Sequence, residues 1–178
     1  MPWERHPDGL ANATELVAMV RELGDFCIGV AAFPDLHPER HDPDLDARIL
    51  VAKADAGASF AITQLFFTPV RYFDLVERVR GLGCDIPIIP GIMPVTRFSQ
   101  IKRFAELSGA ELPASVTDRL NLVSEDEEQV RSVGIELATE LSEELLAGGA
   151  PGLHFITMNR SRSTREIYAR LDPSWRRA

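Results

Sequence analysis

Polar side chains that could bind a ligand follow four apolar segments of the sequence. They occur in FPDLHPERHD, TQLFFT, PGIMPVTRFSQ and TMNRSRS, which are residues 33–42, 63–68, 90–100 and 157–163. Gln64 is unusual because it lies inside the apolar run FAITQLFF. A buried primary amide must find hydrogen-bond partners, either in the protein core or on a bound molecule. Spacing alone leaves both interpretations of Gln64 open.

Two further groups of residues suggest binding chemistry. Side chains with metal-ligating atoms gather in the first polar segment, namely Asp35, His37, Glu39 and His41. The segment is rich in proline and lacks helical i, i+4 spacing, so a solvated acidic loop is favoured and no metal is predicted. Lys53 and Arg48 could contact a phosphate, although cations on a helix are also common on protein surfaces.

Helices and short apolar strands alternate along the chain. Helices are predicted over 10–23, 42–57 and 68–83, with caps at Asn12, Asp42 and Thr68 and a glycine near each end. The strands CIGVAAF, FAITQLFF and PIIPGIM follow them. Further helices are expected over 97–109, 113–123, 124–149 and 161–171, with GLHFITMN as the last strand. The cap of the long helix is predicted to be Ser124, with Glu127 three residues later.

This alternation predicts an α/β fold with parallel strands. An open doubly wound sheet that binds a dinucleotide would carry GxGxxG after its first strand, and the sequence has none. A (β/α)8 barrel of the TIM type is therefore favoured, but such a barrel needs eight strands and about 250 residues. The chain has 178 residues. We expect one partial barrel domain, residues 1–178, of about four β/α units. Pro90 and Gly91 interrupt the third strand, either as a bulge or where a ligand meets the backbone.

Composition excludes several classes of function. A formal net charge of -8 argues against binding to nucleic acid or to an anionic membrane surface. No apolar run approaches the ~18 residues of a membrane span, and the N-terminus MPWERHPDGL is unlike a secretory signal, so a cytoplasmic location is expected. Cys27 and Cys84 are expected to be small buried residues, and His154 a core histidine.

Four motifs in this order resemble the methylenetetrahydrofolate reductase family: AAFPDLHPE, KADAGASFAITQLFF, IIPGIMPV and HFITMNR. The resemblance implies the second half of a catalytic (β/α)8 barrel, strands five to eight, with the first four strands absent. It implies a flavoprotein of one-carbon metabolism and methionine biosynthesis. Such an enzyme binds FAD and uses NAD(P)H to reduce 5,10-methylenetetrahydrofolate to 5-methyltetrahydrofolate.

The resemblance also implies roles for individual residues. The positions that match FAD contacts are Phe33, His37, Asp46 and Lys53, and those that match the folate and nicotinamide pocket are Gln64, Gln100, Phe104 and Arg160. Two positions differ from some relatives, with Phe33 replacing Tyr and Ala52 replacing Arg. The family's general-acid glutamate and flavin-adjacent aspartate belong to the missing half, so no catalytic residue is assigned.

We therefore expect the chain alone to be inactive. A half barrel exposes two sheet edges and part of its core, which favours association with a second copy or with a separate N-terminal half. The alternative to an enzyme is a non-catalytic half-barrel module that works through such an association.

Overall fold

The computed structural model describes residues 6–35, 37, 41–97, 99, 101, 103–105 and 110–176. Its elements alternate between helix and strand over residues 13–89, as predicted. In chain order they are α1 (Ala13–Leu23), β1 (Gly29–Ala32), α2 (Pro43–Asp55), β2 (Phe60–Thr63), α3 (Pro69–Gly81), β3 (Ile88–Ile89), β4 (Gly91–Ile92), α5 (Ala114–Asn121), α6 (Glu127–Ala147), β5 (His154–Phe155), α7 (Ser161–Arg170) and the short 3-10 helix η1 (Pro173–Arg176). Ser99, Ile101 and residues 103–105 are also helical, within the predicted helix 97–109.

Side-chain caps begin two of the predicted helices where the sequence indicated. The Asn12 side chain accepts hydrogen bonds from the backbone N–H groups of Thr14 and Glu15, and Asp42 caps α2 in the same way ahead of Pro43. Thr68 occupies the cap position of α3, but its side chain makes no capping hydrogen bond.

The predicted cap of the long helix is wrong. α6 begins after Asp126, whose Oδ1 accepts from Glu128 N at 2.9 Å and from Gln129 N at 3.1 Å. Ser124 belongs instead to the turn that follows α5, because its backbone N–H donates to the carbonyl of Asn121 at 3.3 Å. Asp126, two residues after Ser124, therefore caps the helix in place of the predicted pair of Ser124 and Glu127.

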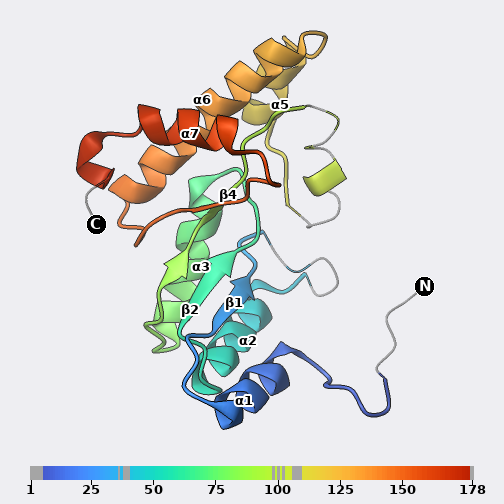
Figure 1. Ribbon diagram of the computed structural model, residues 1–178, viewed down its shortest axis with the longest axis vertical. Coiled ribbons are helices and arrows are strands. Elements are labelled where there is room, and N and C mark those ends of the chain that lie inside the picture. Colours follow the sequence, from blue (N-terminus) through green and yellow to red (C-terminus); the bar gives the residue numbers. More distant parts are fainter. Residues whose placement is uncertain are drawn as a thin grey trace.

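All strand pairs among the described residues are parallel. β1, β2 and β3 form a three-stranded sheet in that order, and β4 and β5 form a two-stranded sheet. In Figure 1 the chain is stacked from α1 and α2 at the bottom, past β1, β2 and α3, to α6 and α7 at the top. The α/β prediction is confirmed, and the strands of the described chain do not close into a barrel.

The predicted strand PIIPGIM is divided at Pro90, where it changes its partner from β2 to β5. Gly91 N donates to Thr63 Oγ1 at 2.8 Å, so a threonine hydroxyl of β2 continues the pairing past the break. A Cβ at Gly91 would overlap the carbonyl oxygen of Thr63. Only glycine therefore allows β4 to stay against β2.

The two faces of the strands differ in burial. Helices α2, α3, α6 and α7 cover one face, where the core contains Ala32, Ala61, Ile88 and Ile92. Tyr72 on α3 joins this face to β3, because its hydroxyl donates to the carbonyl of Ile88 at 2.8 Å. Side chains on the opposite face, among them Phe60, Ile62 and Ile89, are only half-buried. We call this second surface the inner face.

Two burial predictions are wrong. His154 is exposed, because the alternation along β5 places it on the inner face, which the described elements leave uncovered. Cys27 is exposed in the connection between α1 and β1, whereas Cys84 is buried as predicted. Within the part of the chain that the structure covers, none of the helices combines the length and apolar character of a membrane span.

The contact between Gly91 and β2 predicts a large effect of a small substitution. Gly91→Ala should lower the free energy of unfolding by about 1–3 kcal/mol, because the added methyl group has no space. Gly152→Ala is the matched control, since no atom lies within 4 Å of its added Cβ. Urea denaturation of both variants measures this, and equal stabilities would contradict the assigned role of Gly91.

Candidate functional site

Of the four residues predicted to contact FAD, Phe33 and Asp46 both contact His37 after β1, and Lys53 contacts β1 itself. Asp46 Oδ2 on α2 accepts a hydrogen bond from His37 N at 2.8 Å. The rings of Phe33 and His37 meet edge to face, with centroids 4.8 Å apart and an interplanar angle of 68°. Lys53 Nζ donates to the carbonyl of Ala31 at 2.9 Å. Asp46 of α2 thus holds the loop after β1, and Lys53 of α2 holds the strand itself.

Lys53 is not a surface cation. Lys53 is only 7% exposed, whereas Arg48, five residues earlier on α2, is exposed. A buried ammonium needs polar partners, because transferring a charge from water into the protein interior is unfavourable. The surface interpretation is therefore wrong for Lys53 and holds for Arg48.

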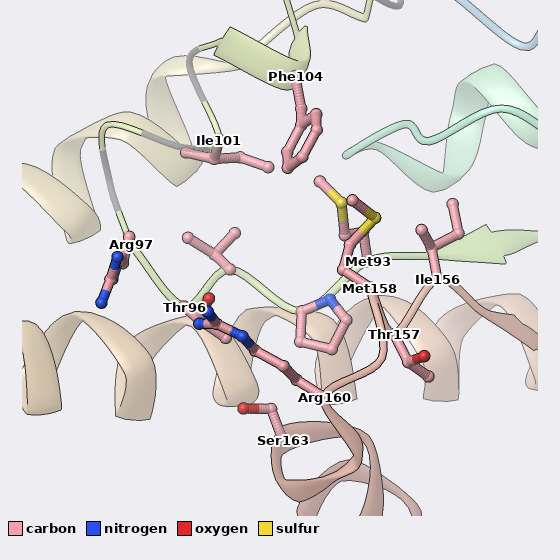
Figure 2. A pocket seen from close by; sticks show the side chains of 12 residues that line it. Met93, Thr96, Arg97, Ile101, Phe104, Ile156, Thr157, Met158, Arg160 and Ser163 are labelled. Carbon is pink, nitrogen blue, oxygen red and sulfur yellow. The ribbon is translucent and has the colours of Figure 1, made fainter.

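Phe104 and Arg160 line one cavity of about 240 Å³ at the ends of β4 and β5. Figure 2 shows Phe104 above the two methionines Met93 and Met158, while the side chain of Arg160 points along the cavity toward Thr96. The cavity is completed by Pro94, Val95, Arg97, Ile101, Ile156, Thr157 and Ser163. One part of its wall is therefore apolar and rich in sulfur, and another carries two guanidinium groups.

The cationic part of this cavity comes from two elements. Arg160 is the cap residue of α7, and its side chain makes no capping hydrogen bond. Arg97 follows β4 and lies 3.6 Å from Glu127 at the start of α6, measured from Nε to Oε1. Both arginines are exposed, so they can reach an anionic group on a molecule in the cavity. Such an arrangement suits a flat apolar ligand with an acidic end.

Several of these residues were missed by the sequence analysis. Met93, Arg97 and Met158 lie in the polar segments after the third and fourth predicted strands, but methionine and arginine carry no spacing signal of their own. The segment after β4 also rests tightly on α6, because a Cβ at Gly134 would overlap the carbonyl of Val95. Gly134 thus sets how closely this wall of the cavity approaches α6.

The remaining predicted site residues do not join this cavity. The alternation along β2 buries Ala61 and Thr63 against the helices, which places Gln64 on the inner face with Phe60 and Ile62. Its Oε1 accepts from Leu65 N at 3.3 Å, and the side chain is half-buried. Gln64 does not line the cavity of Phe104 and Arg160. Gln100 lies outside the described residues.

Asp35, a member of the acidic loop, is engaged in an ion pair. Its side chain is 5% exposed, with Oδ1 3.3 Å from Arg71 Nε, and Oδ2 accepts from Glu111 N at 3.2 Å. Arg71 also contacts the carboxylate of Glu111 at 2.6 Å. Glu39 lies outside the described residues, and within those that are described no three metal-ligating side chains gather. Asp35, Arg71 and Glu111 thus connect the loop after β1, the first turn of α3 and the segment before α5.

Burial raises the pKa of Asp35 above its ordinary value. The hydrogen bond from Glu111 N and the charge of Arg71 lower the pKa and offset this only in part, because Arg71 is 44% exposed and its charge is screened by water. The nearby carboxylate of Glu111 raises the pKa further. Ionised Asp35 is therefore less favourable in the folded chain than in water.

Comparison with known proteins shows the family of this chain. The family model described as methylenetetrahydrofolate reductase matches residues 1–172. The chain belongs to the methylenetetrahydrofolate reductase family. It is 37% identical over 171 residues to methylenetetrahydrofolate reductase 1 of Schizosaccharomyces pombe, covering 95% of this chain and 28% of that protein. It is 37% identical over 155 residues to 5,10-methylenetetrahydrofolate reductase of Escherichia coli, covering 87% of this chain and 52% of that protein.

The chain thus spans about half the length of its bacterial relative and less than a third of the yeast one. Among solved structures it resembles an uncharacterized protein from Clostridium thermocellum that binds two copies of 5-methyl-5,6,7,8-tetrahydrofolic acid. The TM-score is 0.63 and the identity 16%, over 92% of this chain and 59% of that one. At this identity the likeness establishes the shared fold.

The raised pKa of Asp35 predicts a pH dependence of stability. A carboxyl group whose pKa is raised on folding favours the folded state at low pH, and this contribution is lost as the pH rises from about 3.8 through the raised value. The free energy of unfolding of the unmodified chain should therefore fall as the pH rises over this range, and Asp35→Asn should not show this fall. Urea denaturation at several pH values tests this, and parallel profiles for the two proteins would contradict it.

Proposed function

We propose that this chain supplies strands five to eight of a (β/α)8 barrel that reduces 5,10-methylenetetrahydrofolate to 5-methyltetrahydrofolate. NAD(P)H is the reductant and FAD the cofactor, as the resemblance implies. Family membership supports this proposal, and so does the similarity of fold to a protein that binds a methylated tetrahydrofolate. We further propose that the complete protein acts in the cytoplasm.

The observation that carries the proposal is the cavity of Phe104 and Arg160. Folates combine a flat heteroaromatic ring with an acidic tail. Phe104, Met93 and Met158 offer aromatic and sulfur surfaces to a flat ring, and Arg97 and Arg160 offer positive charge to a carboxylate. In a protein of net charge -8, this local pair of arginines is suited to holding an anionic ligand.

The residues at the end of β1 fit FAD in their chemistry. Lys53 supplies a positive charge and His37 an imidazole near the strand end, as an anionic diphosphate needs, and Phe33 supplies an aromatic surface. Asp46 would hold the loop in place through His37 N. When bound, FAD would supply the transfer of hydride from NAD(P)H to the folate. Gln64, on the inner face between the two groups of residues, would contact the folate through its amide.

No catalytic acid is assigned to this chain. Opening the bridging methylene requires a proton on the departing nitrogen, which general-acid catalysis supplies. The family places that glutamate in the first half of the barrel, so we expect no turnover by the 178-residue chain alone. The uncovered inner face also favours a second candidate, a non-catalytic half barrel that works by associating with another chain.

The affinity for folate should depend on Arg160. Arg160→Gln should weaken the binding of 5-methyltetrahydrofolate to the chain by about tenfold, the equivalent of one charge-assisted hydrogen bond. Isothermal titration calorimetry under nitrogen measures this dissociation constant. Without any affinity for this folate in the unmodified chain, the non-catalytic module would be favoured.

Arg162→Gln provides the matched control for this titration. Arg162 lies two residues further along α7, pairs with Glu166 at 3.1 Å and does not line the cavity. Its replacement removes the same charge from the same helix, so the affinity for folate should not change. Equal losses in both variants would show a general effect of charge and would contradict the specific role of Arg160.

A further inference from the structure

A second cavity, of about 260 Å³, lies between β4, the start of α3, α5 and α6. None of the described residues that the sequence analysis assigned to FAD, folate or nicotinamide lines it. Its walls are mainly apolar. They are formed by Phe66 and Phe67 from the segment between β2 and α3, Val116 from α5, and Leu137, Ala138 and Leu141 from α6. It is therefore a space separate from the candidate folate site.

The cavity exists because two hydrophobic clusters meet without filling the space between them. Phe66, Ile92 and Ala138 belong to the main core under the strands. Val95 and Val116 belong to a smaller cluster under α5. Protein interiors are normally packed without such spaces, and an apolar cavity of this size is suited to an apolar molecule. Met93 and Val95 line both cavities and so form a wall between them.

The charged side chains at this cavity favour a cation. Arg119 is engaged by two carboxylates, because it contacts Glu140 through both Nη atoms at 2.6 and 3.1 Å and lies 3.5 Å from Glu136. Glu144 lines the cavity one turn beyond Glu140 and is exposed, and no ion pair joins it to another described residue. The carboxylate of Glu144 is thus available to a ligand, whereas the guanidinium of Arg119 is not.

We infer that this cavity binds a small hydrophobic molecule that carries an ammonium group. The apolar body contacts Phe66, Leu137 and Leu141, and the ammonium group contacts the carboxylate of Glu144. A carboxylate ligand is disfavoured because it would face Glu140 and Glu144 with Arg119 already paired. A ligand here lies directly behind the wall of the candidate folate site.

Methyl NMR of the 178-residue chain tests this with 2-phenylethylammonium and its neutral isostere 2-phenylethanol. Saturable shifts are expected for the methyl groups of Val116, Leu137 and Leu141. The ammonium compound should bind about two- to fivefold more tightly than the alcohol, as expected for one exposed ion pair. Shifts confined to Ile156 and Met158, or equal affinities of the two compounds, would overturn the inference.

Two variants and a control locate the interaction. Glu144→Gln should remove the preference for the ammonium compound, whereas Glu143→Gln, an exposed neighbour on α6 outside the cavity, should keep it. Ala138→Leu should fill the space and abolish the binding of both compounds, because Ala138 is 6% exposed and lines the cavity. Loss of the preference in Glu143→Gln as well, or its retention in Glu144→Gln, would contradict the assigned carboxylate.

Discussion

The hydrogen bond from Gly91 N to Thr63 Oγ1 connects the two sheets of this protein. β3 pairs with β2, but β4 pairs with β5, so the chain exchanges partners at Pro90. The hydroxyl of Thr63 continues the contact of β2 with this strand past Pro90, where the backbone pairing of β2 with β3 has ended. The close approach needs a residue without a Cβ, and Gly91 provides it. The break is therefore a bonded junction that sets the position of β4 and β5 against β2.

Both groups of candidate ligand-binding residues depend on this junction. Phe33 and His37 follow β1 on one side of it, and Arg160 follows β5 on the other. Parallel strands bring their carboxyl ends to one edge, so the relative position of the groups is determined by how the two sheets are joined. Helices α2 and α6 then hold the loops from behind, through Asp46 with His37 N and through Gly134 beneath Val95.

Much of the fold could be predicted because its signals are local. Asn12, Asp42 and the prolines after the caps determine where helices begin, and apolar runs mark the strands. The wrong predictions concern competition or context. Asp126 caps α6 in place of Ser124, because the backbone N–H of Ser124 is bonded within the turn after α5. His154 is exposed because the inner face lacks a covering layer in the described chain.

The candidate site was less predictable from spacing. Phe104 and Arg160 lie far apart in the sequence, and only the family resemblance brought them together before the structure placed them in one cavity. Met93, Arg97 and Met158 were missed because methionine and arginine carry no spacing signal of their own. Gln64 occupies the inner face as the alternation of β2 predicts, while its contact with folate stays a proposal.

The cavity between β4, β5 and the segment around Phe104 is the proposed folate site. The methionine methyl groups report on it directly, because Met93 and Met158 line the cavity whereas Met19 lies exposed on α1. During a titration with 5-methyltetrahydrofolate, the NMR signals of Met93 and Met158 should shift together along one saturation curve while Met19 stays unchanged. Unchanged Met93 and Met158 signals, or an equal shift of Met19, would contradict the claim.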